Sequence, residues 1–80
     1  MVDPGTQKPF HVRTDALGEA YIKVSVNGLE CLRKLLDDND IRHWVDHYAV
    51  SVDGGPASTM IYLHRKTDPT RVQALLDSAA

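Results

Sequence analysis

The chain of 80 residues has one cysteine and no long hydrophobic run. A single cysteine excludes a disulfide within the chain, so nothing in the sequence requires an oxidising compartment. No apolar stretch approaches the roughly 18 residues of a membrane span. Residues 1–10 also lack the apolar core and basic start of a signal peptide. We therefore expect a cytoplasmic protein that does not enter a membrane.

Excess charge of one sign is also absent. Nine basic and eleven acidic side chains give a net charge of −2, which disfavours binding to nucleic acids or to anionic membranes. No Gly-rich phosphate loop, paired-cysteine motif or recognisable catalytic triad is present, and we expect no cofactor. The composition, 42% apolar and 25% charged, is that of one small globular domain.

Two halves of the chain show the same order of periodic segments. Residues 1–8 contain Pro4 and Gly5 without periodicity, so we expect a flexible tail before a single domain over 9–80. Residues 10–14 and 21–27 alternate apolar and polar side chains around a polar turn, as antiparallel strands do. Asn27 and Glu30 have capping-box spacing, which predicts the start of a helix. A leucine stripe follows (Leu29, Leu32, Leu35, Leu36).

The first helix is expected to end at the "DDND" sequence of residues 37–40. Asn39 is the predicted left-handed residue, and Ile41 is expected to fold back on the last turn. In the second half, residues 47–52 alternate, residues 53–56 ("DGGP") form a hairpin signal, and residues 58–66 form the return strand. Asp68 and Pro69 then predict a helix start. Its stripe repeats the first at an offset of forty (Val72, Leu75, Leu76, Ala79).

The repeated pattern predicts an α+β fold. Two ββα units, over residues 9–40 and 43–80, would form a four-stranded antiparallel sheet with two helices packed on one face. A chance match of Leu-Leu-Asp sequences is the alternative, and the strand order stays open. The predicted inward-facing residues are Phe10, Val12, Ile22, Val24, Val26, Tyr48, Val50, Val52, Ile61 and Leu63.

The sheet face away from the helices would be bare, and it is either a solvated surface or a contact surface. Tyr, Met and Arg are typical of interface cores. Alternation also places Ser25, Ala49 and Ser51 on this face. The candidate contact residues are His11, Arg13, Tyr21, Lys23, His47, Met60, Tyr62 and His64.

Several features allow other interpretations. His43 and His47 lie about 13 Å apart on a strand, too far to chelate one metal ion, and His11, His47 and His64 are a weaker cross-strand alternative. Cys31 is expected to be a small buried side chain. Trp44 is expected to pack at the sheet edge, or else to be an exposed binding anchor. The basic residues 64–66, with Arg71, adjoin a helix N-terminus that suits an anion.

These observations favour a small non-catalytic protein-interaction module. Its partner would be another protein or a second copy, most simply in a homodimer. The alternative is a small-molecule or metal-binding domain, possibly an enzyme, that uses the His and Tyr side chains of the same face. RNA or single-stranded DNA is disfavoured by the net charge and by the missing stacking motif.

Overall fold

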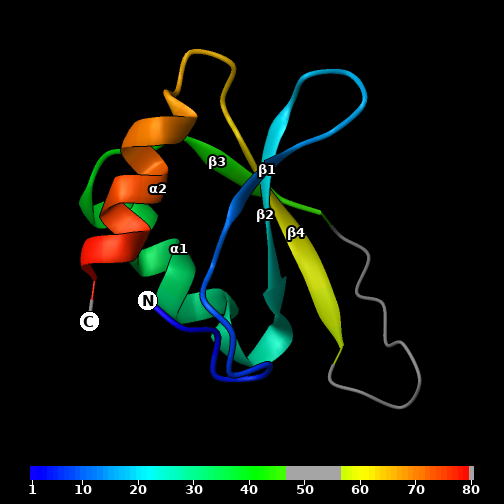
Figure 1. The fold of residues 1–80 in the computed structure, drawn as a ribbon, viewed down its shortest axis with the longest axis vertical. Helices are drawn as coiled ribbons and strands as arrows, with labels where there is room; N and C mark the ends of the chain where they lie inside the picture. Colours follow the sequence, from blue (N-terminus) through cyan, green and yellow to red (C-terminus); the bar gives the residue numbers. More distant parts are fainter. Residues whose placement is uncertain (47–56, 80) are drawn as a thin grey trace.

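The computed structural model describes residues 1–46 and 57–79. Within these ranges the chain forms an antiparallel sheet of four strands together with two α-helices, so the predicted α+β class is confirmed (Figure 1). A single 3-10 turn, Val26–Gly28, leads into the first helix. The elements in chain order are β1 (Val12–Thr14), β2 (Ala20–Ser25), α1 (Leu29–Asp38), β3 (His43–Val45), β4 (Ser58–Leu63) and α2 (Pro69–Ser78).

The strand order is β1-β2-β4-β3, and every neighbouring pair is antiparallel. The two six-residue strands, β2 and β4, therefore lie in the centre, where each pairs on both sides. Their register places Ile22 opposite Ile61 and Tyr21 opposite Tyr62. The short strands β1 and β3 form the edges, which limits the backbone available for unwanted strand pairing.

The hydrophobic core contains side chains from the central strands and from both helices. In β4, Ile61 and Leu63 are buried while Met60 and Tyr62 are half-buried, so the predicted inward pair is confirmed. The helix stripes contribute the residues that are three or four positions apart, as expected for one apolar helix face. The buried core residues are Phe10, Ile22, Val24, Leu32, Leu36, Ile41, Ile61, Leu63, Val72 and Leu76.

The predicted start of α1 is wrong. The Ser25 hydroxyl accepts a hydrogen bond from the Gly28 amide at 3.2 Å, and α1 begins at Leu29 without a side-chain cap, so Asn27 does not cap the helix. Strand alternation also stops at Ser25. Ser25 is paired with Ser58 at the end of β2 but is fully buried, because Asp3 and Gly5 pack against it. Val26 is 48% exposed, the reverse of the prediction, because it belongs to the 3-10 turn, where the strand period does not apply.

The other helix termini follow the sequence more closely. The Ile41 amide donates to the Leu36 carbonyl at 2.9 Å and Ile41 is buried, so the predicted fold-back is confirmed. The left-handed residue is Asp40, with φ of 55°, and not Asn39 as expected. The Asp68 carboxylate accepts from the Thr70 amide at 2.9 Å, and Pro69 is the first residue of α2, as predicted.

The two halves of the chain match less well in their strands than in their helices. The helices begin at Leu29 and Pro69, which keeps the offset of forty. Strand β3, His43–Val45, lies upstream of the strand predicted at 47–52. Residues 47–52, which include Tyr48, Val50 and Val52, and the turn at 53–56 lie outside the described residues.

Residues 1–9 lie against the end of β2. Asp3 is buried, and its carboxylate accepts hydrogen bonds from the Ser25 amide at 2.7 Å, from the Ser25 hydroxyl and from the Gly5 amide at 2.9 Å. A Cβ atom at Gly5 would lie 2.2 Å from the Ser25 Oγ, so the close approach requires glycine. The flexibility predicted for residues 1–8 stays a prediction.

The helices that the structure describes can be compared with the requirements of a membrane-spanning helix. In residues 1–46 and 57–79, neither helix combines the length and the apolar character that a membrane span needs. The cytoplasmic location stays a prediction.

Candidate functional site

Three aromatic side chains from three adjacent strands lie side by side on the sheet. Tyr21 of β2 is opposite Tyr62 of β4, and Tyr62 is opposite Trp44 of β3. The ring centroids are 5.9 Å apart in both pairs; the tyrosines are tilted by 44°, whereas Trp44 and Tyr62 are stacked at 14°. We call Tyr21, Tyr62 and Trp44 the aromatic row. Arg13 of β1 extends it, because Arg13 is opposite Tyr21.

Charged side chains form a second line of residues across the sheet, nearer to the turn at 15–19. The Asp15 amide donates to the Glu19 carbonyl at 2.9 Å, and the His64 amide donates to the Arg42 carbonyl at 3.1 Å. Glu19 and His64 each lie two residues beyond the outermost β2–β4 pair, Tyr21 and Tyr62. We call this line, with two acids on one side and two bases on the other, the acid–base row: Asp15, Glu19, His64 and Arg42.

A third line lies on the other side of the aromatic row. Lys23 is opposite Met60, and the Asp46 amide donates to the Met60 carbonyl at 2.9 Å. Continuing the β1–β2 register places His11 opposite Lys23. This mixed row consists of His11, Lys23, Met60 and Asp46. Because side chains alternate along a strand, the strand residues of these rows lie on the face opposite Ile22 and Ile61, which we call the open face.

The electrostatic environment of Tyr62 agrees with this arrangement. Partial burial raises the pKa of Tyr62 above its ordinary value, and the carboxylates of Asp15, Asp46 and Glu19 and the Tyr21 phenol raise it further. The negative carboxylates disfavour a tyrosinate anion. Tyr62 therefore keeps its hydroxyl proton at neutral pH and can donate a hydrogen bond to a molecule on the open face.

We expect one tyrosine to titrate above the ordinary range in the folded protein. Because the folded pKa of Tyr62 is raised, its contribution to stability is complete below the unfolded value of about 10 and is lost as the pH rises through the folded pKa. Ultraviolet difference spectroscopy of the tyrosines measures this. The Tyr62→Phe variant should lack the late-titrating component, and an unchanged titration curve would contradict the assignment.

Most of the predicted contact residues lie on the open face. Arg13, Tyr21 and Tyr62 belong to or extend the aromatic row, whereas Ser25, which was expected on this face, is buried. His47, Ala49 and Ser51 lie outside the described residues. Sequence reasoning did not assign Trp44 to this face. It lies on the edge strand β3 and stacks on Tyr62, as the edge-packing prediction stated, and it is still 47% exposed; its role as a binding anchor stays a prediction.

The histidines do not form a metal site in the described part of the chain. Within residues 1–46 and 57–79, no group of three or more His, Cys, Asp or Glu side chains is close enough to hold a metal ion. His43 lies on the core side of β3, where its Nδ1 is 2.9 Å from the Ile41 carbonyl and its Nε2 is 3.9 Å from an Asp37 carboxylate oxygen. A site that includes His47 stays a prediction.

Two further predictions concern α1 and α2. Cys31 is exposed, so its predicted burial is wrong. It precedes the buried Leu32 by one residue, which turns it about 100° away from the core around the helix axis. At the start of α2, the Asp68 carboxylate accepts a hydrogen bond from the Thr70 amide. An anion site beside residues 64–66 and Arg71 stays a prediction.

Comparison with known proteins gives no match. Neither the sequence nor the structure is significantly similar to a protein family, a curated protein or a solved structure. The functional interpretation therefore follows from the geometry and chemistry of the open face.

Proposed function

We propose that this chain is a non-catalytic protein-interaction module whose open face binds a second copy of the same chain. The observation that carries the proposal is the aromatic row, in which Trp44 is 47% exposed beside Tyr62 and Tyr21. Tryptophan, tyrosine and arginine are the side chains that most often dominate binding energy. A small domain also gains much from additional buried surface, since it buries a modest fraction of its own.

The order of residues in each row favours self-association. A two-fold axis parallel to the strands, midway between β2 and β4, would bring Tyr21 onto the partner's Tyr62 and Arg13 onto the partner's Trp44. The tyrosines would stack in the centre. The arginine would lie on the indole ring, an attractive cation–π arrangement. Because the axis is two-fold, each contact would occur twice.

The acid–base row and the mixed row lie on either side of the aromatic row. Their charges are also complementary when the same two-fold rotation is applied. In the acid–base row, Asp15 would face the partner's Arg42, and Glu19 would face the partner's His64. In the mixed row, His11 would face the partner's Asp46. A two-fold axis perpendicular to the strands would instead bring Arg13 onto its own copy. Charge complementarity therefore favours the parallel axis.

We also infer an arrangement of the two ββα units in which the helices leave the open face uncovered. The domain over residues 9–80 would consist of ββα units at 9–40 and 43–80, with both helices packed on one face of the sheet. The shared core supports this, because Leu32 and Leu36 of α1 and Val72 and Leu76 of α2 occupy matching positions forty residues apart.

Sedimentation velocity over a range of protein concentrations tests the proposed function directly. We expect the sedimentation coefficient to rise from that of a monomer to that of a dimer. In high salt, dimers should form only at a higher protein concentration, because salt screens the attraction between opposite charges in the acid–base row and the mixed row. A monomer at the highest concentration would contradict self-association.

The Arg42→Glu variant tests the complementary charges. The substitution would place a carboxylate against the partner's Asp15, so we expect the dimer dissociation constant to rise by about tenfold. Arg71→Glu is the matched control, because Arg71 is exposed on α2 and makes the same change of charge. Equal dissociation constants for the two variants would exclude the proposed orientation.

A further inference from the structure

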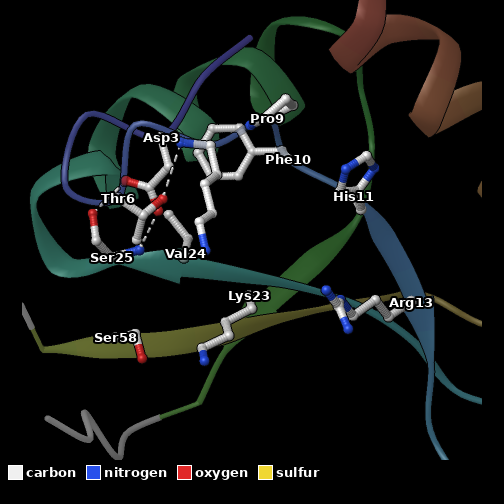
Figure 2. A pocket seen from close by; sticks show the side chains of 11 residues that line it. Asp3, Thr6, Pro9, Phe10, His11, Arg13, Lys23, Val24, Ser25 and Ser58 are labelled. Atoms are coloured by element: carbon white, nitrogen blue, oxygen red, sulfur yellow. Dashed lines mark hydrogen bonds between the residues drawn. The ribbon is translucent and has the colours of Figure 1, made fainter. Parts of the chain in front are cut away.

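A cavity of about 340 Å³ lies between the N-terminal residues and the end of β2 (Figure 2). Residues 3–11 contribute one wall, and Lys23, Val24 and Ser25 contribute the other. Pro9 is the exposed apolar residue of the lining, whereas Phe10 and Val24 belong to the hydrophobic core behind it. The volume lies at the lower end of the range for small-molecule sites, about 300–1,000 Å³.

The cavity is strongly basic, although the chain as a whole carries a net charge of −2. Lys8, Arg13 and Lys23 line it, and His11 lies beside them. Among the residues that the structure describes, none of these three permanent cations forms an ion pair. Figure 2 shows Arg13 and Lys23 extending from neighbouring strands. Such a concave cluster concentrates positive potential and attracts anions.

The carboxylate in the lining, Asp3, does not neutralise this cluster. Both of its oxygens accept hydrogen bonds, from Ser25 and from the Gly5 amide, and Asp3 is only 3% exposed. It acts as the tether that holds the N-terminal segment against β2. The three permanent cations therefore exceed the single acidic charge of the lining.

We propose that this cavity binds a small organic phosphate that has a compact apolar portion. The phosphate group would lie between Arg13 and Lys23, with Lys8 close by, because a phosphomonoester carries nearly two negative charges and accepts charge-assisted hydrogen bonds. The apolar portion would contact Pro9 and the methylene groups of Lys8 and Lys23. One chain supplies the whole cavity, but Arg13 and Lys23 also belong to the open face, so phosphate binding would compete with the proposed self-association.

Nuclear magnetic resonance titration of the full chain with phenyl phosphate tests the site. We expect saturable shifts at the amides of Thr6, Val24 and Ser25, with phenyl phosphate binding about tenfold more tightly than inorganic phosphate because its ring contacts apolar side chains. Sodium chloride at matched ionic strength should not reproduce these shifts. No saturable shift with either phosphate, or shifts centred elsewhere, would overturn the proposal.

A pair of double variants separates a specific site from general attraction. Arg13→Gln with Lys23→Gln should weaken phenyl phosphate binding by at least about tenfold. Arg33→Gln with Lys34→Gln removes the same charge from exposed positions on α1 and should leave binding unchanged. Equal weakening in both would overturn the proposal. The titration is repeated in the Tyr62→Lys variant, which is expected to be a monomer. With no partner covering Arg13 and Lys23, phenyl phosphate should bind that variant at least as tightly as the unmodified chain, so either proposal can fail without the other.

Discussion

The Tyr62→Lys variant should be a folded monomer. Tyr62 lies in the centre of the aromatic row between Tyr21 and Trp44, and in the proposed dimer it would be buried against the partner's Tyr21. A lysine there would place two charges in a dry interface. We expect the association free energy to fall by about 2 kcal/mol or more, which raises the dimer dissociation constant at least about thirtyfold. Sedimentation velocity measures the change.

The fold itself should tolerate this substitution. Asp15, Glu19 and Asp46 are the carboxylates that raise the pKa of Tyr62, and the same negative charges would stabilise a lysine ammonium in the monomer. Ala74→Lys is the control, because Ala74 is exposed on α2 and gains the same charge away from the sheet. A Tyr62→Lys variant that associates as tightly as the control would show that the open face is not the interface.

The second large effect concerns the core. Leu36→Ala in α1 and Leu76→Ala in α2 should each lower the free energy of unfolding by about 2–5 kcal/mol, because both side chains are completely or almost completely buried. This is a large share of the stability of a small domain, about 5–15 kcal/mol. Urea denaturation followed by both circular dichroism and Trp44 fluorescence measures the loss.

The circular dichroism and the Trp44 fluorescence should show unfolding at the same urea concentration if the two helices share one cooperative core with the sheet. Circular dichroism reports mainly on the helices, whereas Trp44 reports on β3. Leu17→Ala is the control, because Leu17 is 86% exposed in the turn between β1 and β2, and it should change stability little. A Leu76→Ala variant that loses helical signal but keeps the Trp44 transition of the unmodified chain would show that α2 is not part of the shared core.

Periodicity correctly predicted which residues of the central strands face the core. Ile22, Val24, Ile61 and Leu63 are buried, as alternation indicated. The prediction failed at Val26, because a 3-10 turn replaces the strand there, and at Ser25, because the N-terminal segment covers it. The buried Asp3 could not be recognised either, because its partner Ser25 is distant in sequence and forms no motif with it.

The candidate site depended more strongly on the fold. The sequence placed Tyr21 and Tyr62 on one face, but the aromatic row exists because β2 and β4 pair in the centre and β3 pairs beside β4. The basic cavity was missed for a similar reason. Lys8 lies in a segment that sequence reasoning treated as a tail, and only its position against β2 brings it near Lys23.

The sequence alone therefore determined the α+β class, the Asp68–Pro69 start of α2 and the inward faces of β2 and β4, because these properties depend on neighbouring residues and on their spacing. The tertiary structure decided the strand order, the alignment of Tyr21, Tyr62 and Trp44, and the tether between Asp3 and Ser25. The physical reason is that a period of two specifies which face a side chain occupies, whereas the neighbouring strand is chosen by packing and hydrogen bonding across the whole sheet.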